Sequence, residues 1–587
     1  MDLKQKLPVT YLLFTSRGRL SRSTFWTALI FSLSAFYVLS NLFLWLGASF
    51  LAYLLYPALF WVLVCILTKR LHDSGRSGKQ VLWLLLPVFG PLYVFYLSGF
   101  RRGELLKNRF GSVPGSKADY AKNDDGEELT EYPKTSGRII NDVTKLNPIL
   151  VKEVIRPESI EELCAAIKNT ENAVSLGGGR FSMGGQTAST QSVHIDLRKL
   201  NRVIEFKPEN KFIKVEAGIR WCDIQQLIDP HHLSVKIMQT YANFTVGGAS
   251  SVNAHGRYMG QGPAVLSVRE IQVVLADGSL LEASKEQNQE IFYAAIGGYG
   301  AIGIIATATL NLAENVPVKR IHQKLSRTDY GTYFQNHVRN NRTAVFHNGD
   351  IYPPDYKRMR AVSWVETDEK PTVKTRLMPL KDSYPIERYF LWAFTSTPWG
   401  KWRREFLIDP ILYLQKKIHW RNYEAGYDVA ELEPKSRKDS TYVLLEYFVP
   451  IASFQQFADR MAEIFTRFNV NVLNVSVRHA LADPGTYLAW AREEVFAFVV
   501  YYKQDTSAVD KNKVAVWTRE LADAVIAVNG AYYLPYQIHP TIEQFHKAYP
   551  NAHKLFKLKR KLDPGYKFRN SLWDSYYTPS LSENYEY

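Results

Sequence analysis

Cysteine is scarce in this chain of 587 residues, and the three present, Cys65, Cys164 and Cys222, lie far apart. Their spacing excludes a disulfide framework and a cysteine-based metal site, and no cleavage pattern of a secretory signal is visible. Histidines such as His231 and His232 also lack metal-ligand spacing, so we expect no bound metal. The sequence therefore predicts reduced thiols in a reducing compartment.

Acidic residues are scarce in one region only. Residues 1–115 carry 13 Lys/Arg and 3 Asp/Glu, whereas the rest of the chain carries 59 and 54, so +10 of the net charge of +15 lies in the N-terminal region. A nucleic-acid-binding domain would concentrate basic residues on its own surface. We therefore expect no nucleic-acid partner.

Charge is absent from two long N-terminal runs, Phe25–Gly47 and Ala48–Leu67. Each is long enough to span the hydrocarbon layer of a membrane, which is about 30 Å thick. A third apolar run, Gln80–Ser98, is broken at its middle by two prolines and a glycine. The sequence predicts a membrane domain over 1–111, with spans at 25–47 and 48–67 and a re-entrant hairpin or third span at 80–98.

Basic clusters flank these runs at Lys4–Arg22, Lys69–Lys79 and Arg101–Arg109. The positive-inside rule places all three clusters in the cytoplasm if the third run enters the bilayer and returns. We expect a multi-pass protein of the inner membrane, with the lipid bilayer as a partner and the catalytic part in the cytoplasm. A third complete span would place that part on the opposite side.

Three short motifs, Arg17–Trp26, Arg70–Gly78 and Asn108–Gly111, resemble a small bacterial inner-membrane domain of unknown function, number 805 in that series. The resemblance implies location and no chemistry. His72 and Asp73 could form a proton or ligand site, or belong to a loop pair at the membrane surface. Residues 112–138 are rich in Gly, Ser, Lys, Asp and Glu and predict a linker, after which a second domain begins near Ile139.

Glycine is concentrated in three later segments, Val174–Gln186, Thr245–Arg257 and Ile296–Ile304, each beside an expected strand. Glycine lets main-chain N–H groups approach a ligand closely, which suits a diphosphate. A single such loop is a weak signal, but three suit a long dinucleotide threaded through one domain. The spacing does not fit a Rossmann unit, which packs its glycines into one turn.

These segments, with the hairpin Val268–Gly278 and the tail Gln544–Asn570, resemble the FAD-binding oxidoreductases of the vanillyl-alcohol oxidase / p-cresol methylhydroxylase (PCMH) type. The nearest branches are the sugar-1,4-lactone oxidases and the flavoprotein subunit of decaprenylphosphoryl-ribose 2′-epimerase. The expected fold is an α-helical membrane domain followed by two parts that the resemblance implies, an α+β PCMH-type FAD-binding domain (139–315) and an α+β substrate or cap domain (316–530). A C-terminal segment (531–587) would return to the flavin site.

The resemblance also implies which residues hold FAD. The first loop places Phe181 where many relatives attach the flavin to a histidine, so we expect FAD that is bound without a covalent link. The expected cofactor-binding residues are Gly177, Gly178, Gly179, Arg180, Phe181, Ser182, Gly185, Gln186, Thr245, Val246, Gly247, Gly248, Ser251, His255, Gly256, Gly298, Gly300, Gly303, Ile304 and Asn570.

Oxidation of an alcohol requires loss of a hydride to the flavin and of a proton to a base. The sequence offers His539 as the base, Tyr536 as an orienting group, and Arg478 and His255 as further catalytic candidates. Tyr536 stands where the epimerase carries a lysine, which argues against epimerase activity. His255 matches a histidine near the flavin in the relatives, although a lone histidine can also be a core residue.

The segment Arg388–Arg421 mixes tryptophans with basic residues, which suits either a membrane interface or the core of a cap domain. The expected function is oxidation of a C–OH group of a sugar, a sugar lactone similar to D-arabinono-1,4-lactone, or a polyol, with quinone or O₂ as acceptor. One alternative is oxidation of a lipid-linked polyprenyl-phosphate sugar as half of an epimerase pair. Another is a membrane sensor that uses FAD without turnover.

Overall fold

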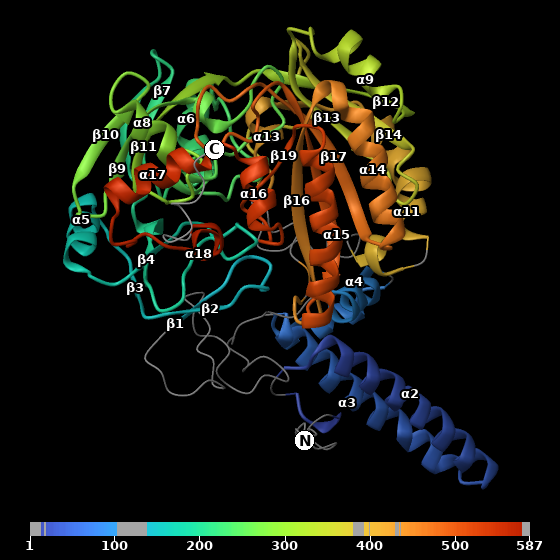
Figure 1. Cartoon of the computed structure of the whole chain (residues 1–587). Coiled ribbons are helices and arrows are strands. Elements are labelled where there is room, and N and C mark those ends of the chain that lie inside the picture. Colours follow the sequence, from blue (N-terminus) through green and yellow to red (C-terminus); the bar gives the residue numbers. More distant parts are fainter. Residues whose placement is uncertain are drawn as a thin grey trace. The chain divides into compact units, whose positions relative to one another are not determined.

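The protein divides into two compact units, Met1–Glu127 and Glu128–Tyr587. The structure is a computed structural model (Figure 1). The residues that it describes are 13–16, 19–74, 76–87, 89–101, 138–379, 392–397, 399–428, 434 and 436–577. The expected linker, apart from Arg138, and the basic residues at 4–6 and 102–109 lie outside this part of the chain.

Two long apolar helices, α2 (Arg22–Trp45) and α3 (Ser49–Asp73), dominate the first unit. The Ser21 side chain accepts a hydrogen bond from the N–H of Thr24 and so starts α2. The two helices bury a narrow seam between them and leave most other apolar side chains exposed, among them Phe31 and Phe60. By length and composition both helices could cross a membrane.

Buried charges join three segments of this unit at one end of the helix pair. Asp73 accepts hydrogen bonds from Arg19 Nε at 3.0 Å and from Arg70 Nη1 at 2.5 Å. Arg70 Nε also donates to the carbonyl oxygen of Ser98 at 2.9 Å. Asp73, one of the two residues that the sequence analysis considered as a proton or ligand site, therefore pairs with two arginines. Arg19 precedes α2, and Arg70 lies in the last turn of α3.

The third apolar run forms a 3-10 helix, η1 (Gly78–Leu85), and a helix, α4 (Phe89–Gly99). Its start lies beside the end of α3, because a Cβ on Gly78 would come within 2.4 Å of Thr68 Cγ2. Its end lies beside the start of α2, where Trp26 Nε1 donates to the carbonyl oxygen of Gly99 at 3.1 Å. The run therefore leaves and returns to the same end of the helix pair.

The second unit begins with a glycine-loop part, residues 138–316, that combines three sheets with short helices. A two-stranded antiparallel sheet pairs β1 (Arg138–Ile140) with β2 (Ile149–Val151). A parallel sheet has the order β3 (Glu153–Ile155), β5 (Val193–Asp196), β4 (Val174–Gly177). The antiparallel sheet contains β6 (Val203–Lys207), β7 (Phe212–Glu216), β8 (Leu233–Val235), β9 (Val268–Val274), β10 (Leu280–Ser284) and β11 (Ile304–Glu314). The helices are α5 (Ile160–Asn169), α6 (Trp221–Ile228), α7 (Val246–Ser251) and α8 (Gln289–Ala295).

Two local predictions from the sequence of this part are confirmed, the helix start at Ser159 and the turn at Asp277–Gly278. The Ser159 side chain accepts from the N–H of Glu162 and starts α5, as the capping pattern predicts. Asp277 and Gly278 form the turn between β9 and β10, with Gly278 at φ +84°. The expected mixture of helix and sheet is therefore present.

An eight-stranded sheet with the order β15-β12-β14-β13-β17-β18-β16-β19 forms the large-sheet part, residues 317–532. Its strands are β12 (Pro317–Ser326), β13 (Ala344–Ile351), β14 (Arg358–Glu366), β15 (Ile418–Trp420), β16 (Ser440–Pro450), β17 (Asn471–Ala480), β18 (Val495–Asp505) and β19 (Ala531–Tyr532). Helices α14 (Phe454–Arg467) and α15 (Ala508–Ile526) lie along one face of the sheet (Figure 1).

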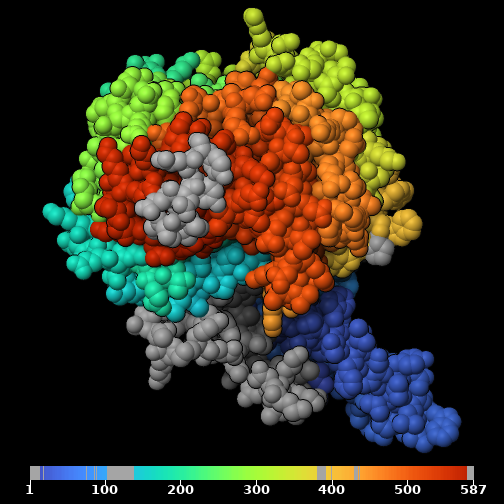
Figure 2. Space-filling model, viewed as in Figure 1, coloured from blue at the N-terminus to red at the C-terminus, as the bar shows by residue number. Residues whose placement is uncertain are grey.

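The C-terminal helices α16 (Ile542–Ala548), α17 (Ala552–Leu562) and α18 (Ser571–Tyr576) return to the glycine-loop part. In Figure 2 the red surface of the C-terminal residues lies between the green elements and the orange ones. Phe568 bridges to Val174 of β4, and the buried Lys559 ammonium donates to the carbonyl oxygen of Ala301 at 2.7 Å. One hydrophobic core therefore runs from Leu146 to Tyr577 through both parts.

Candidate active site

A cavity of about 440 Å³ lies where the glycine segments, the large sheet and the C-terminal segment meet. Its volume is typical of a small-molecule site. Seventeen of the residues expected at the site line it: Gly177, Gly178, Gly179, Arg180, Phe181, Ser182, Gln186, Thr245, Gly247, Gly248, Ser251, His255, Gly300, Ile304, Arg478, Tyr536 and Asn570. The remaining expected residues, Gly185, Val246, Gly256, Gly298, Gly303 and His539, do not line it.

The first glycine segment continues from β4 and packs so closely on its neighbours that no side chain fits at Gly177 or Gly178. A Cβ on Gly178 would come within 2.4 Å of Thr245 Oγ1, and a Cβ on Gly177 within 2.7 Å of His194 Nε2. Arg180 follows in a left-handed conformation with φ +58° and pairs with the buried Asp196 at 3.2 Å. At Gly177 and Gly178 the loop therefore presents main chain, rather than side chains, to the cavity.

Some of the expected glycines serve packing instead. A Cβ on Gly298 would lie 1.9 Å from the carbonyl oxygen of Ala294, and one on Gly303 would lie 2.6 Å from Val273 Cγ1. Gly256 is similarly close to the carbonyl oxygen of Met238. These positions require glycine because the backbone packs closely, a requirement that looks the same in sequence as contact with a ligand.

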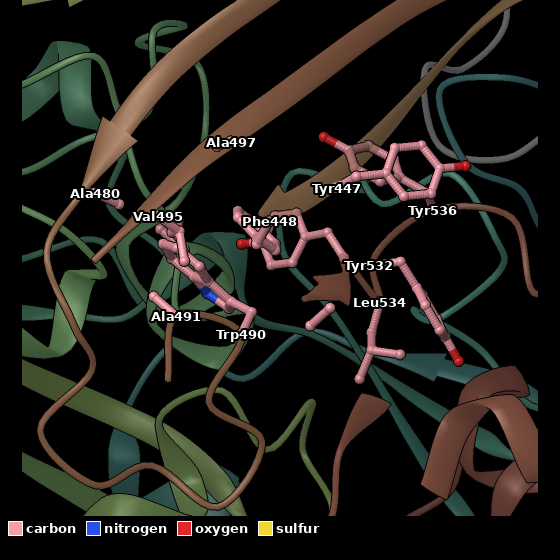
Figure 3. Packing of buried hydrophobic residues seen from close by; sticks show 14 of the residues in the cluster. Tyr447, Phe448, Ala480, Trp490, Ala491, Val495, Ala497, Tyr532, Leu534 and Tyr536 are labelled. Carbon is pink, nitrogen blue, oxygen red and sulfur yellow. The ribbon is translucent and has the colours of Figure 1, made fainter. Parts of the chain in front are cut away.

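Phe181, at the position where the relatives attach the flavin, lines the cavity and packs against Phe244 with ring centroids 4.5 Å apart. A phenyl ring has no nucleophilic atom, so it supplies packing rather than a covalent bond. Beside His255, the Phe448 ring stacks on Trp490 with ring centroids 4.0 Å apart (Figure 3), and neither ring is among the residues that line the cavity. His255 packs against Trp490 at 5.0 Å, which holds its imidazole in place.

The three catalytic candidates in the cavity gather around a residue that the sequence analysis missed, Glu446 of β16. The Glu446 Oε2 atom lies 2.7 Å from His255 Nε2, and Glu446 Oε1 accepts a hydrogen bond from the Tyr536 hydroxyl at 2.5 Å. Arg478 of β17 lines the same cavity, and its buried Nε has no hydrogen-bond partner among the described residues. The sequence does contain an indication of Glu446. It is the single acid in the apolar run Tyr442–Pro450, and an acid in such a run is expected to be buried with a partner.

The charges around Glu446 favour its ionised form. Burial raises the pKa of this carboxyl, but His255, Arg478 and the Tyr536 hydrogen bond outweigh burial and leave the pKa below its usual value. Burial raises the pKa of Tyr536 well above its usual value, and the neighbouring Glu446 charge adds to this. Tyr536 is therefore a neutral hydrogen-bond donor at neutral pH, and Glu446 is an acceptor.

His539 does not reach this group. It is outside the cavity lining, and its carbonyl oxygen accepts a hydrogen bond from Arg519 Nε at 2.8 Å. Burial, with a smaller contribution from Arg519, lowers the pKa of His539 to about 4. The side chain belongs to the loop before α16, so its closeness to Tyr536 in sequence does not bring it to the same surface.

The residues of the cavity fit a bound FAD. Residues of all three glycine segments line it, aromatic side chains such as Phe181, Phe244 and Tyr533 line it as well, and buried polar groups converge at Glu446. A dinucleotide needs main-chain donors for its phosphates and an apolar wall for its rings. The structure supplies both in one cavity.

Comparisons with known proteins agree with this geometry. Residues 151–284 match the family described as "FAD binding domain", and residues 13–112 match "Protein of unknown function (DUF805)". L-gulonolactone oxidase of Mus musculus is 22% identical over 431 residues, which cover 70% of this chain and 91% of that protein. D-arabinono-1,4-lactone oxidase of Yarrowia lipolytica is 29% identical over 174 residues, which cover 28% and 32%. Cytokinin dehydrogenase 2 of Arabidopsis thaliana is 25% identical over 217 residues, which cover 36% and 43%.

The fold, the cavity and these matches define the class of this protein as an FAD-dependent oxidoreductase. More particularly, the chain carries an FAD-binding domain of the PCMH type behind an N-terminal DUF805 region. The DUF805 match and the two apolar helices suggest that the protein associates with a membrane.

Proposed function

We propose that this protein is a membrane-anchored oxidoreductase that oxidises a C–OH group of a sugar lactone, sugar or related polyol with FAD. The observation that carries the proposal is the buried Glu446 carboxylate, which is held in the cavity by His255 and Tyr536 beside Arg478. Relatives named as lactone oxidases, one matched over most of its length, support a lactone-like substrate.

The glycine segments and Asn570 would hold FAD. When bound, FAD supplies the acceptor for the hydride that leaves the substrate carbon. Because Phe181 has no nucleophilic atom, the proposed FAD is bound without a covalent link. Acid or heat denaturation should release yellow flavin into the supernatant, and flavin that stays with the precipitated chain would contradict this.

The proton of the substrate hydroxyl leaves through Tyr536 and Glu446. The substrate O–H donates to the Tyr536 oxygen, and as its proton moves there, the proton of Tyr536 passes to Glu446 Oε1 at 2.5 Å. His255 Nε2 holds the other carboxylate oxygen and fixes its orientation. Arg478, whose Nε is buried and without a hydrogen-bond partner among the described residues, donates to the oxygen that becomes the carbonyl. The proposed base is therefore Glu446 rather than His539.

Helices α2 and α3 are the proposed anchor, in the inner membrane. The run of η1 and α4 starts and ends at the same end of these helices, which supports two complete spans and a re-entrant hairpin. An even number of crossings leaves both chain segments that flank the anchor in the cytoplasm. Cysteines placed at Ser16 and Ser74, in a background without the native three, should resist an impermeant thiol reagent in intact cells.

The substrate class is tested by anaerobic bleaching of the flavin in the full-length protein. We expect a sugar-1,4-lactone or a polyol to bleach the visible absorbance of the flavin, because a hydride from the substrate reduces it. The bleached protein is then mixed with O₂ or with a quinone to identify the acceptor. If a lipid-linked sugar bleaches the flavin and no lactone, free sugar or polyol does, the proposed substrate class is wrong and lipid-linked sugars take its place.

A further inference from the structure

A helical segment of the large-sheet part has its polarity reversed. It runs through α11 (Gly400–Arg403), the π-helical turn η6 (Arg404–Ile408) and α12 (Asp409–Leu414). Its acids face inward, with Glu405 2% and Asp409 8% exposed, whereas Ile411 is 64% and Leu414 83% exposed. A surface helix of a water-soluble protein shows the opposite arrangement.

The inward acids are fixed by partners on the sheet. Glu405 accepts from Arg358 Nε at 2.5 Å and pairs with Lys324 at 3.1 Å. Asp409 accepts a hydrogen bond from the Tyr352 hydroxyl at 2.7 Å. Rotating the segment to bury its apolar side would break these buried pairs. The pairs therefore hold the apolar side outward.

The outward side forms an apolar patch, consisting of Trp402, Phe406, Leu407, Ile411, Leu412 and Leu414. Basic residues that are exposed or half-buried surround the patch along the chain: Lys401, Arg403, Arg404, Lys416 and Lys417. The acids beside it, Glu369 and Asp355, are ion-paired with Lys416 and Arg358, so basic residues are in excess there. Apolar and tryptophan side chains beside basic ones match the interface of a bilayer with anionic headgroups. Exposed apolar side chains gathered on one short segment indicate an interaction surface.

We propose that this apolar patch docks on the anionic surface of the bilayer. The same chain carries two helices apolar enough to cross a membrane, so a bilayer is available to it. The segment is also tied to the cavity, because Arg404 Nη2 donates to Asn474 Oδ1 at 3.0 Å and Asn474 lines the cavity. Docking brings this edge of the cavity to the lipid surface, and it does not depend on the proposed substrate.

The test uses the full-length protein in proteoliposomes that contain nitroxide-labelled and anionic lipids. A fluorophore is attached to a single cysteine, L407C, in a background whose three native cysteines are alanine. The matched control is I204C on β6, because Leu407 and Ile204 are similarly exposed, at 49% and 47%. We expect strong quenching at 407, little quenching at 204, and weaker quenching at 407 when the anionic lipid is replaced by a zwitterionic one.

A second variant separates docking from folding. I411D with L412D should release the fluorophore at 407 from the lipids while the flavin content stays unchanged. Equal, weak quenching at 407 and 204 in a protein that remains in the vesicles would overturn the proposal. Energy transfer between labels at 407 on two copies of the chain, without quenching by lipid, would show that a second copy covers the patch and would also overturn it.

Discussion

Among the histidine–glutamate pairs at the large sheet, two have nearly the same geometry, His255–Glu446 and His479–Glu494, and only the first faces the cavity. His255 Nε2 lies 2.7 Å from Glu446, and His479 Nε2 lies 2.6 Å from Glu494. The first pair lines the cavity together with Tyr536, whereas neither member of the second does. The two pairs therefore have the same residue types and nearly the same distance between Nε2 and the carboxylate oxygen. They differ in whether the pair lines the cavity.

The alternation of a β-strand explains the difference. Arg478 and His479 are successive residues of β17, so their side chains point to opposite faces of the sheet. Arg478 meets the cavity, and His479 packs on Phe334 behind the sheet, while Glu494 also binds the half-exposed Arg339. The second pair ties surface elements together, and the first keeps a carboxylate where a substrate can reach it.

The largest expected effect is on the rate of flavin reduction, and it distinguishes Glu446 from Glu494. E446Q should slow anaerobic flavin reduction by about 10²–10⁴-fold, the usual contribution of a positioned base. The matched change E494Q also removes a carboxylate from a histidine, but it should leave the rate near that of the wild type. Stopped-flow absorbance with a saturating substrate measures both variants. Equal losses in the two variants would show that the cavity pair has no special role.

A smaller loss is expected when the hydroxyl between substrate and carboxylate is removed. Y536F should reduce the rate of flavin reduction by about 10–10²-fold, because Glu446 can still accept a proton less directly. The control is Y549F, since Tyr549 is buried but donates to the carbonyl oxygen of Tyr532 outside the cavity. A Y536F enzyme as fast as Y549F would remove Tyr536 from the proposed proton path.

The stability of the protein should depend on pH through Glu446. Its folded-state pKa is below the usual value, so its ionised form stabilises the fold above the unfolded pKa, and this stabilisation is lost as pH falls through the folded pKa. The difference in melting temperature between the wild type and E446Q should be constant from about pH 7 to 5 and should narrow below about pH 4.5. A difference that widens on acidification would mean that Glu446 is protonated in the folded state.

The smallest effect is expected at the histidine that the sequence suggested as the base. H539N should keep the rate of flavin reduction within about 2-fold of the wild type, because His539 lies outside the cavity. The same stopped-flow measurement serves here, with flavin content as the control for folding. A loss as large as that of E446Q would restore His539 as the base and remove Glu446 from that role.

Local structure was largely predictable, because caps, turns and apolar runs act over a few residues. The Ser159 helix start and the Asp277–Gly278 turn follow from such signals, and the three glycine segments do meet at one cavity. Two features required the tertiary structure. Glycines at 298 and 303 look like ligand contacts but serve packing, and Glu446 becomes a site residue only because β16 lies beside the C-terminal segment.

The central claim is that this cavity removes a hydride from the carbon of a C–OH group. The most direct test is anaerobic reduction of the flavin by a lactone or polyol that reduces it, compared with the same compound carrying deuterium on the reacting carbon. We predict slower bleaching with the deuterated compound, because the C–H bond breaks as the flavin is reduced. Bleaching at the same rate after saturation with either compound, in the wild type and in the slowed E446Q variant alike, would contradict the account.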